Sequence, residues 1–288
     1  MTNNNSDPML PTDVEVPINY LLETSETPVF HQSDTAADLQ NAEGSRKAHP
    51  MKIQNARLIP NKFSLDVHGF TLENQHSLVT DFHDDFQLKS MYEPELKKLL
   101  TKLIDCKEII IFDHTHRSSA AENREMHNSR PPVAAPHSDY TDTSAHERLR
   151  DVIGDAAKEK QKKRFAIINV WRSINGTIEE WPLAVCDSQT VNDRLMIATL
   201  RHAPHREEPS FEYSRQSETN HACYDSNHKW FYFSKMTQNE ILIFKNYDTL
   251  KDGKTARYTL HTAFKDPTSP VNPSPRETIE SRVIIFFE

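Results

Sequence analysis

Histidine and aspartate spaced two residues apart offer the clearest capacity for chemistry in this chain. The chain has 15 histidines, and the pattern His-x-Asp occurs twice, at His83-Asp84-Asp85 and His137-Ser138-Asp139. On a β-strand, side chains two residues apart point to the same face, so the tripeptide can present an imidazole and a carboxylate to one metal ion. Such tripeptides also arise by chance in a histidine-rich chain. Because His83 lies in an acidic run that is typical of a solvated surface, we predict ligands at His137 and Asp139.

A second histidine from a later strand would complete the ligand set. His261 stands in the strand-like run RYTLHTAF at 257–264. Two imidazoles and one carboxylate on one side of an ion leave its other side open for substrate and oxygen, which suits non-haem Fe(II). We therefore predict His261 as the third ligand, with His221 and His228 as the alternatives for that position.

An arginine and a hydroxyl follow in the order Arg276-Glu277-Thr278, just before the last strand-like run. A guanidinium fork binds a carboxylate through two parallel hydrogen bonds, and a hydroxyl two residues on can assist from the same face. Arg276 and Thr278 are thus candidates for anchoring a carboxylate. Arg282 has the same strand parity, so it could replace Arg276, bind a substrate carboxylate or form a structural ion pair.

Four further residues are candidates for the pocket. Asn169 and Arg172 share a strand-like run but point to opposite faces of it, which makes Asn169 the better cavity residue and leaves Arg172 free to pair with a carboxylate. Tyr140 follows the His-x-Asp tripeptide, and Ile284 lies in the last strand. For Tyr140, ordinary packing in a strand is the simpler interpretation.

The second half of the chain has the pattern of a mainly β protein. Alternating or short apolar runs predict strands at 51–59, 63–70, 108–112, 165–174, 183–186, 211–215, 230–233, 240–245, 256–264 and 281–287. Helices are expected from Glu93 onward and over 144–160, with a polar loop at 114–136 and an extended piece at 137–141. Short strands separated by turns favour an antiparallel sandwich or jelly-roll. We predict an N-terminal arm over 1–50, packed on a single domain over 51–288.

Composition excludes several classes of protein. Five glycines in 288 residues, none close to another, leave no glycine-rich loop for a dinucleotide or nucleotide phosphate. A net charge of −8 disfavours nucleic acid as a partner. Three scattered cysteines indicate neither a disulfide framework nor a zinc site. No apolar run approaches the length of a membrane span, so we expect a cytoplasmic protein.

The order of these motifs resembles a known family. His137-x-Asp139, then His261, then Arg276-x-Thr278 is similar to the Fe(II)/2-oxoglutarate oxygenases. The blocks that narrow the resemblance to the gibberellin-desaturase-like and cephamycin-hydroxylase-like group of secondary metabolism are VPINY (16–20), HSDYT (137–141), NVWR (169–172), WPLA (181–184), WFYF (230–233), FKNYD (244–248), HTAF (261–264) and PRETIESR (275–282). Thr278 stands where the family more usually has serine.

The resemblance implies a double-stranded β-helix core, Fe(II) bound by His137, Asp139 and His261, and 2-oxoglutarate and O₂ as cosubstrates. It implies hydroxylation, desaturation or oxidative ring closure of a small molecule. Arg282 and Arg172, as arginines that could face the cavity, indicate a carboxylate-bearing or amino-acid-like substrate. Two alternatives stay open on the residues: a metalloenzyme on the same barrel that does not use 2-oxoglutarate, and a non-catalytic jelly-roll binding or accessory protein. The sequence leaves the substrate, the reaction outcome and the oligomeric state undetermined.

Overall fold

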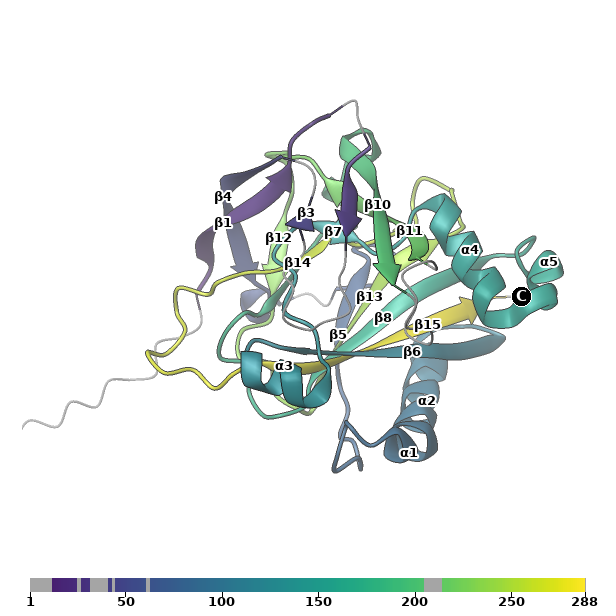
Figure 1. Ribbon diagram of the computed structural model, residues 1–288, viewed down its shortest axis with the longest axis horizontal. Helices are drawn as coiled ribbons and strands as arrows, with labels where there is room; N and C mark the ends of the chain where they lie inside the picture. Colours follow the sequence, from purple (N-terminus) through teal and green to yellow (C-terminus); the bar gives the residue numbers. More distant parts are fainter. Residues whose placement is uncertain are drawn as a thin grey trace, which may run out of the picture.

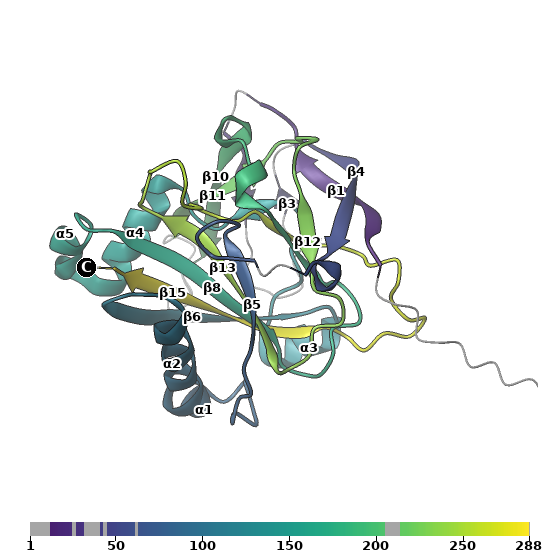
Figure 2. The same cartoon turned by 180° about the vertical axis from the view of Figure 1, so that it is seen from behind.

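Strands outnumber helices in the computed structural model, which describes residues 12–24, 27–31, 41–42, 45–60, 63–204 and 214–287. They form two curled sheets (Figure 1), and the view from behind shows β5, β13, β8, β15 and β6 side by side in the smaller one (Figure 2). The mainly β architecture expected from the sequence is therefore confirmed.

The larger sheet carries ten strands in the described ranges. In sheet order they are β1 (Val14–Leu21), β4 (Arg46–Asn55), β12 (Trp230–Tyr232), β9 (Leu183–Cys186), β14 (His261–Ala263), β7 (His137–Ser138), β11 (Ser214–Ala222), β10 (Met196–Pro204), β2 (Val29–His31) and β3 (Asn41–Ala42). Its central strands β14 and β7 are very short, and they carry the candidate histidine ligands.

The smaller sheet has five strands and backs the site. In sheet order they are β5 (Phe70–Asn74), β13 (Glu240–Asp248), β8 (Phe165–Ser173), β15 (Glu277–Phe286) and β6 (Glu108–Ser118). Every residue of β8 and β13 is buried, because the larger sheet covers one face and helices cover part of the other.

Helices lie outside the two sheets. They are α1 (Asp85–Gln87), a π-helical turn (Leu88–Tyr92), α2 (Glu93–Leu103), α3 (Ala121–His127), α4 (Asp142–Ile153) and α5 (Ala157–Lys160), with 3-10 turns at Ala56–Leu58, Gly154–Ala156, Ser188–Thr190 and Asp193–Leu195. The helix predicted from Glu93 is α2, with Pro94 in its first turn. The helix predicted over 144–160 begins earlier, at Asp142, where the Thr141 side chain caps it, and it breaks at Gly154.

Apolar clusters hold the layers together. Between the sheets, Phe70, Trp171 and Phe244 pack against Val185 and Phe231. On the far side of the smaller sheet, the apolar stripe of α2 packs on the residues of β8, β13 and β15 that point away from the larger sheet. Burial of apolar surface on both faces makes the smaller sheet a rigid floor for the site.

Three predicted strands are wrong in part. The run 63–70 is a turn up to Gly69, whose φ of +86° favours glycine, and strand β5 begins at Phe70. The run 256–264 pairs as a strand only over β14, because the preceding residues make isolated hydrogen bonds to separate segments, such as Ala256 N–H to Asp66 in a turn and Thr259 N–H to Lys245 in β13. The prediction over 211–215 falls largely outside the described residues, and β11 extends beyond it to Ala222.

The polar segment 114–136 is also not the uniform loop we expected. Strand β6 continues to Ser118 and is followed by α3. Polar residues occupy β6 here because alternate side chains face the buried site, where they are paired, as described below. The strand β10, at 196–204, was not predicted at all.

The N-terminal segment contributes a strand to the larger sheet. Strand β1 pairs in antiparallel register with β4, which runs across the predicted boundary at residue 50. Val16, Ile18 and Tyr20 are buried in one apolar cluster with Ile53 and Trp230. The division into an arm over 1–50 and a domain over 51–288 stays a prediction. In the part of the chain that the structure describes, no helix has the length and apolar character needed to cross a membrane.

Candidate metal centre

Strands β7 and β14 bring the three predicted ligands together. His137 and His261 are direct partners across this antiparallel pair, and Asp139 follows β7 immediately. Asp139 Oδ1 lies 3.5 Å from His137 Nε2 and 3.8 Å from His261 Nε2. One donor atom from each residue lies within 4.8 Å of the others, and the described ranges contain no other such group of three. Residues separated by more than 120 positions thus meet at one point.

Hydrogen bonds orient both imidazoles. His137 Nδ1 lies 2.8 Å from the carbonyl oxygen of Ala135, and His261 Nδ1 lies 3.3 Å from that of Thr259. A carbonyl can only accept, so Nδ1–H donates and the Nε2 lone pair faces Asp139. Burial lowers the pKa of His261 to about 3, assisted by the neighbouring His137. The ring is therefore neutral at ordinary pH, which is the form that binds a metal.

The Asp139 carboxylate has two differently used oxygens. Oδ1 faces the imidazoles, while Oδ2 accepts from Asn169 Nδ2 at 3.1 Å, Asn246 Nδ2 at 3.3 Å and Arg282 Nε at 3.4 Å. Three donors on one oxygen hold the carboxylate plane and leave the other oxygen available as a ligand. Asn169, predicted for the cavity, thus lies against the candidate ligand itself.

Arg282 belongs to a buried charge cluster. It contacts Asp113, Asp139 and Glu280, and it donates to the Thr115 hydroxyl at 3.0 Å. Burial disfavours its charge, yet the three carboxylates raise its pKa well above the usual value. Burial likewise opposes ionisation of Asp139, but the positive charge of Arg282 holds its pKa well below the usual range. Of the roles left open for Arg282, its geometry matches the structural ion pair.

Arg276 lies in the same interior, and no carboxylate of the described residues forms an ion pair with it. It is buried, stacks over the Trp171 ring at 5.3 Å, and donates to the Trp181 carbonyl. Its Nε has no hydrogen-bond partner among the described residues. Burial lowers its pKa to about 9, and the nearby Arg117 adds to that effect. Arg117 itself donates to the Pro131 carbonyl at 3.0 Å.

Among the described residues, the guanidinium groups of the buried Arg276 and the half-buried Arg117 donate hydrogen bonds only to backbone carbonyls, an arrangement that suits an added carboxylate. Thr278 is buried and pairs across the sheet with Arg117 on β6 and Ser173 on β8. The donor sets therefore fit both groups that the resemblance implies: two imidazoles and a carboxylate for Fe(II), and an unpaired guanidinium for an oxoacid.

The remaining predicted residues lie further from the ligands. Tyr140 lines a small cavity of about 40 Å³ together with Asp139 and Arg282. Tyr140 and Ile284 are both buried in the apolar cluster below α4. Arg172 points to the opposite side of β8, where it bonds to Gln75 and stacks near Phe82, away from the ligands.

The alternative third ligands are placed elsewhere. His221 stacks on His137 at 5.6 Å between ring centroids, but its Nδ1 lies 3.1 Å from Arg46. His228 hydrogen bonds to the Tyr20 hydroxyl in the N-terminal cluster. Neither offers a nitrogen to the group of donor atoms formed by His261 and its two partners.

Sequence reasoning missed Asn246, Arg117 and Glu280. Glu280 lies midway between Thr278 and Arg282, so strand parity could have identified it. Arg117 was hidden in a segment interpreted as a loop. Asn246 carries no such signal, because its direction depends on an irregularity of β13 between Lys245 and Tyr247.

Known proteins resemble this chain over most of its length. The family model described as "Oxidoreductase/YMDC permease-like domain" matches residues 18–286. Hydroxylase/desaturase CTB9 of Cercospora beticola is 32% identical over 251 residues, covering 83% of this chain and 76% of that protein. The Fe(II)/2-oxoglutarate-dependent dioxygenase nvfI of Aspergillus novofumigatus is 28% identical over 245 residues, covering 83% of each.

The fold has a counterpart among solved structures. The iron and alpha-ketoglutarate-dependent endoperoxidase NvfI superposes with a TM-score of 0.80 at 23% identity, over 96% of this chain and 98% of that one. This likeness confirms the predicted double-stranded β-helix. The family relationship favours an oxygenase over the two alternatives, a metalloenzyme without 2-oxoglutarate and a non-catalytic binding protein. The chain belongs to the hydroxylase/desaturase family of Fe(II)/2-oxoglutarate-dependent oxygenases, oxidoreductases that use Fe(II), 2-oxoglutarate and O₂.

Proposed function

We propose that His137, Asp139 and His261 hold the catalytic Fe(II) of this oxygenase. The observation that carries the proposal is the convergence of their donor atoms within 4.8 Å, with each Nδ1 tied to a backbone carbonyl. Fe(II) and 2-oxoglutarate, when bound, would supply the electrons that activate O₂, and O₂ is the oxidant that allows removal of hydrogen from an unactivated carbon. The protein supplies the fixed ligand geometry and a buried surrounding that keeps water away.

Arg276, with Thr278 beside it on the sheet, is the proposed anchor for the distal carboxylate of 2-oxoglutarate. The unpartnered Nε of Arg276 and its lowered pKa support this role, because a bound dianion would relieve both. Arg282 is the weaker candidate, since three carboxylates already contact its guanidinium. Arg117 adds a second positive charge to the same interior.

The substrate that we propose is a small molecule of secondary metabolism. Support comes from relatives such as the Aspirochlorine biosynthesis protein N of Aspergillus oryzae, which is 28% identical over 144 residues, half of this chain. Arg282 and Arg172, which suggested a carboxylate-bearing or amino-acid-like substrate, both bind groups of the protein instead. Tyr140 is the proposed pocket residue beside the centre. The cavity that it lines next to Asp139 has a volume of about 40 Å³, which holds a few water molecules and not a whole substrate. Hydroxylation, desaturation and ring closure are equally compatible with this arrangement, and a cytoplasmic location stays a prediction.

Anaerobic spectroscopy tests both parts of the proposal. Addition of 2-oxoglutarate to the Fe(II)-loaded protein should produce a visible charge-transfer band, and a true substrate should shift that band. Asp139→Asn should abolish iron uptake, and Arg276→Ala should retain iron but require far more 2-oxoglutarate for the band. Iron uptake without any band in the wild-type protein would contradict the cosubstrate, and full uptake by Asp139→Asn would contradict the ligand set.

A further inference from the structure

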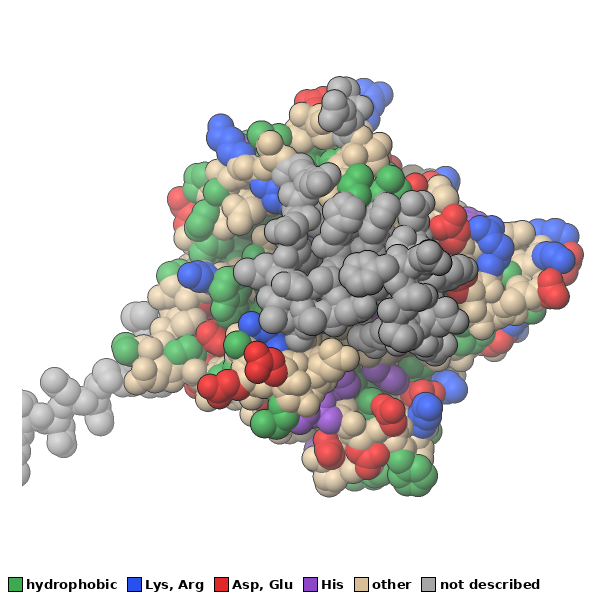
Figure 3. Space-filling model, viewed as in Figure 1, with side chains coloured by type: hydrophobic (Ala, Val, Ile, Leu, Met, Phe, Trp, Pro, Cys, Tyr) green, Lys and Arg blue, Asp and Glu red, His purple; other side chains and the backbone are tan. Residues whose placement is uncertain are grey.

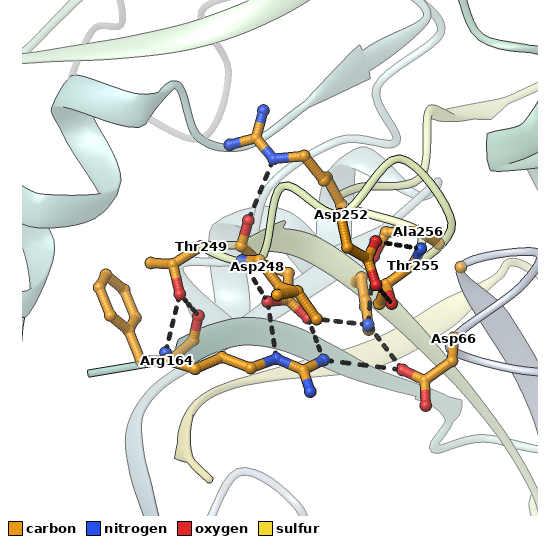
Figure 4. A network of polar contacts seen from close by, with 12 residues as sticks. Asp66, Arg164, Asp248, Thr249, Asp252, Thr255 and Ala256 are labelled. Atoms are coloured by element: carbon orange, nitrogen blue, oxygen red, sulfur yellow. Dashed lines mark hydrogen bonds and ion pairs between the residues drawn. The ribbon is translucent and has the colours of Figure 1, made fainter. Parts of the chain in front are cut away.

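A buried ion network lies on the face of β13 that points away from the metal centre. Lys245 Nζ contacts Asp66 Oδ1 and Asp248 Oδ2, each at 2.9 Å, and donates to the Ala256 carbonyl at 3.1 Å. Arg164 grips Asp248 through Nε at 3.2 Å and Nη2 at 2.8 Å. Figure 4 shows these contacts converging on Asp248. Lys245 and Asp248 are 3% and 0% exposed, and the oxygenase chemistry uses neither of them.

The pairing of Lys245 with Asp248 requires an irregular strand. In a regular strand, residues three apart point to opposite faces. Here the register with β8 slips by one: Lys245 pairs with Ile168, and Tyr247 pairs with Ile167. Asn246 is therefore the extra residue of a β-bulge. The bulge places Lys245 and Asp248 on the same face, so the ion pair can form only while the bulge exists.

The extra residue points at the metal centre. Asn246 is fully buried, and its Nδ2 donates to Asp139 Oδ2 at 3.3 Å. Its Oδ1 accepts from the Asp139 backbone N–H at 3.4 Å, and its carbonyl accepts from the Ser138 hydroxyl at 2.9 Å. These three bonds join β13 of the smaller sheet to the end of β7 in the larger one. They fix both the backbone and the carboxylate of a candidate ligand.

The same bulge also supports the third ligand. The carbonyl of Lys245 accepts from Thr259 N–H at 2.8 Å, and the carbonyl of Thr259 accepts from His261 Nδ1. Gly69 closes this arrangement, because its carbonyl accepts from both Lys245 N–H and the Thr259 hydroxyl. One irregularity in β13 therefore acts on Asp139 through a side chain and on His261 through the backbone.

We propose that the bulge at 245–248, locked by the buried contacts of Lys245, Asp248 and Arg164, positions the metal ligands, with Asn246 as a positioning residue for Asp139. The inference rests on the proposed function, since it needs His137, Asp139 and His261 to bind the metal. β-Bulges commonly direct a side chain beside an active site, and the partners of metal ligands set metal affinity. The ion network is the element that holds this bulge in place.

Metal affinity measured without turnover tests the role of Asn246. We would titrate the full-length protein with Fe(II) under anaerobic conditions by calorimetry, and repeat the titration with Co(II). Asn246→Ala should bind each metal about 10- to 100-fold more weakly. The matched control is Asn55→Ala, because Asn55 is equally buried but bonds to Ser234 far from the ligands. This control should lower the Tm and leave the metal affinity unchanged.

A second pair of variants tests the ion network. Asp248→Asn should weaken metal binding. Glu240→Gln should lower only the Tm, although Glu240 lies on the same strand as Asp248 and forms a bidentate ion pair with Arg57. If Asp248→Asn fails to fold, the double variant Lys245→Met/Asp248→Leu removes both charges together and is expected to show the same weakening.

The possible outcomes distinguish a failure of this inference from a failure of the proposed metal site. A wild-type protein that takes up no metal contradicts the ligand set. A wild-type protein that binds metal, together with Asn246→Ala binding it equally well, overturns the positioning role alone. If Asn246→Ala loses metal affinity but the folded Asp248→Asn or Lys245→Met/Asp248→Leu variant does not, Asn246 keeps its positioning role. The locking role of the ion network is then overturned.

Discussion

Two groups of histidines in this protein differ in where they lie and in how their ring nitrogens are used. His137 and His261 lie between the sheets with a carboxylate between their Nε2 atoms. The second group lies outside, where His83 stacks on His127 at 3.9 Å and approaches His116 at 4.6 Å between ring centroids. Figure 3 shows histidine side chains gathered at the surface between α3 and the α1–α2 segment.

The difference lies in how the ring nitrogens are used. In the buried group, each Nδ1 is tied to a carbonyl, so both Nε2 lone pairs face Asp139. In the outer group, His116 uses Nε2 for the Phe82 carbonyl, and stacked faces keep the nitrogens from converging on one point. His-x-Asp occurs in both groups, at 83–85 and 137–139. A metal site is therefore defined by the orientation of its donors and not by the tripeptide.

The largest expected effect compares the two His-x-Asp aspartates. Asp139→Asn should weaken Fe(II) binding by more than about 100-fold, because loss of a ligand should exceed the 10- to 100-fold typical of losing a ligand's partner. Asp85→Asn, at the exposed aspartate of the tripeptide 83–85, should bind Fe(II) as the wild type does. Anaerobic equilibrium dialysis with iron analysis gives both values. A comparable loss in Asp85→Asn would assign the metal to the outer group.

The next largest effect is expected when the two buried arginines Arg276 and Arg172 are each replaced by lysine. Arg276→Lys should raise the KM for 2-oxoglutarate by about 10- to 100-fold, since a lost charge-assisted hydrogen bond costs about 1.5–3 kcal/mol. Arg172→Lys, also buried but on the opposite face of its strand, should change the Tm and leave this KM unaltered. Steady-state kinetics with varied 2-oxoglutarate measures both. An unchanged KM in Arg276→Lys would exclude Arg276 as the anchor.

A glycine behind the buried group should matter for stability. A Cβ at Gly69 would lie 2.2 Å from the Thr259 hydroxyl oxygen, on a backbone with φ of +86°. Gly69→Ala should therefore lower the free energy of unfolding by about 1–3 kcal/mol, and it should also weaken metal binding through Thr259 and His261. Gly253 also has a positive φ but has open space around it, so Gly253→Ala carries only the cost of the backbone conformation. The difference between the two variants gives the cost of the close contact. Urea unfolding with and without Fe(II) tests this, and equal losses in both variants would contradict it.

The smallest expected effect is a pH dependence in the outer group. Burial, together with the positive charge of a protonated His83, lowers the pKa of His116 to about 4. The unfolded chain, with a histidine pKa near 6.5, takes up protons that the folded protein excludes. Stability is therefore full above about pH 6.5 and falls by about 1 kcal/mol per pH unit as the pH drops toward 4.

His116→Gln tests this dependence, because the glutamine amide can take the place of Nε2 as donor to the Phe82 carbonyl but does not titrate in this range. The variant should lose less free energy of unfolding than the wild type between pH 7 and pH 5, measured by urea denaturation at each pH. Identical losses would show that His116 is protonated as easily in the folded protein as in the unfolded one.

The sequence by itself determined the order of the functional residues and the faces on which many of them lie. His137, Asp139, His261 and Arg276 were predicted because strand parity and residue chemistry are local properties. The opposite orientations of Asn169 and Arg172 followed from the same parity. Local patterns also predicted α2 and most strands of the smaller sheet.

Only the tertiary structure decided which charged residues contact one another and where a strand becomes irregular. Arg282 meets Asp113 and Glu280 because β15 pairs with β6 in one particular register, and Arg117 reaches the interior through the same pairing. Asn246 faces Asp139 because one extra residue in β13 reverses the alternation of that strand. Alternation within a strand can be deduced from neighbouring residues. A bulge or a buried charge cluster is stabilised by partners that lie far away in the sequence, and only the folded chain brings them into contact.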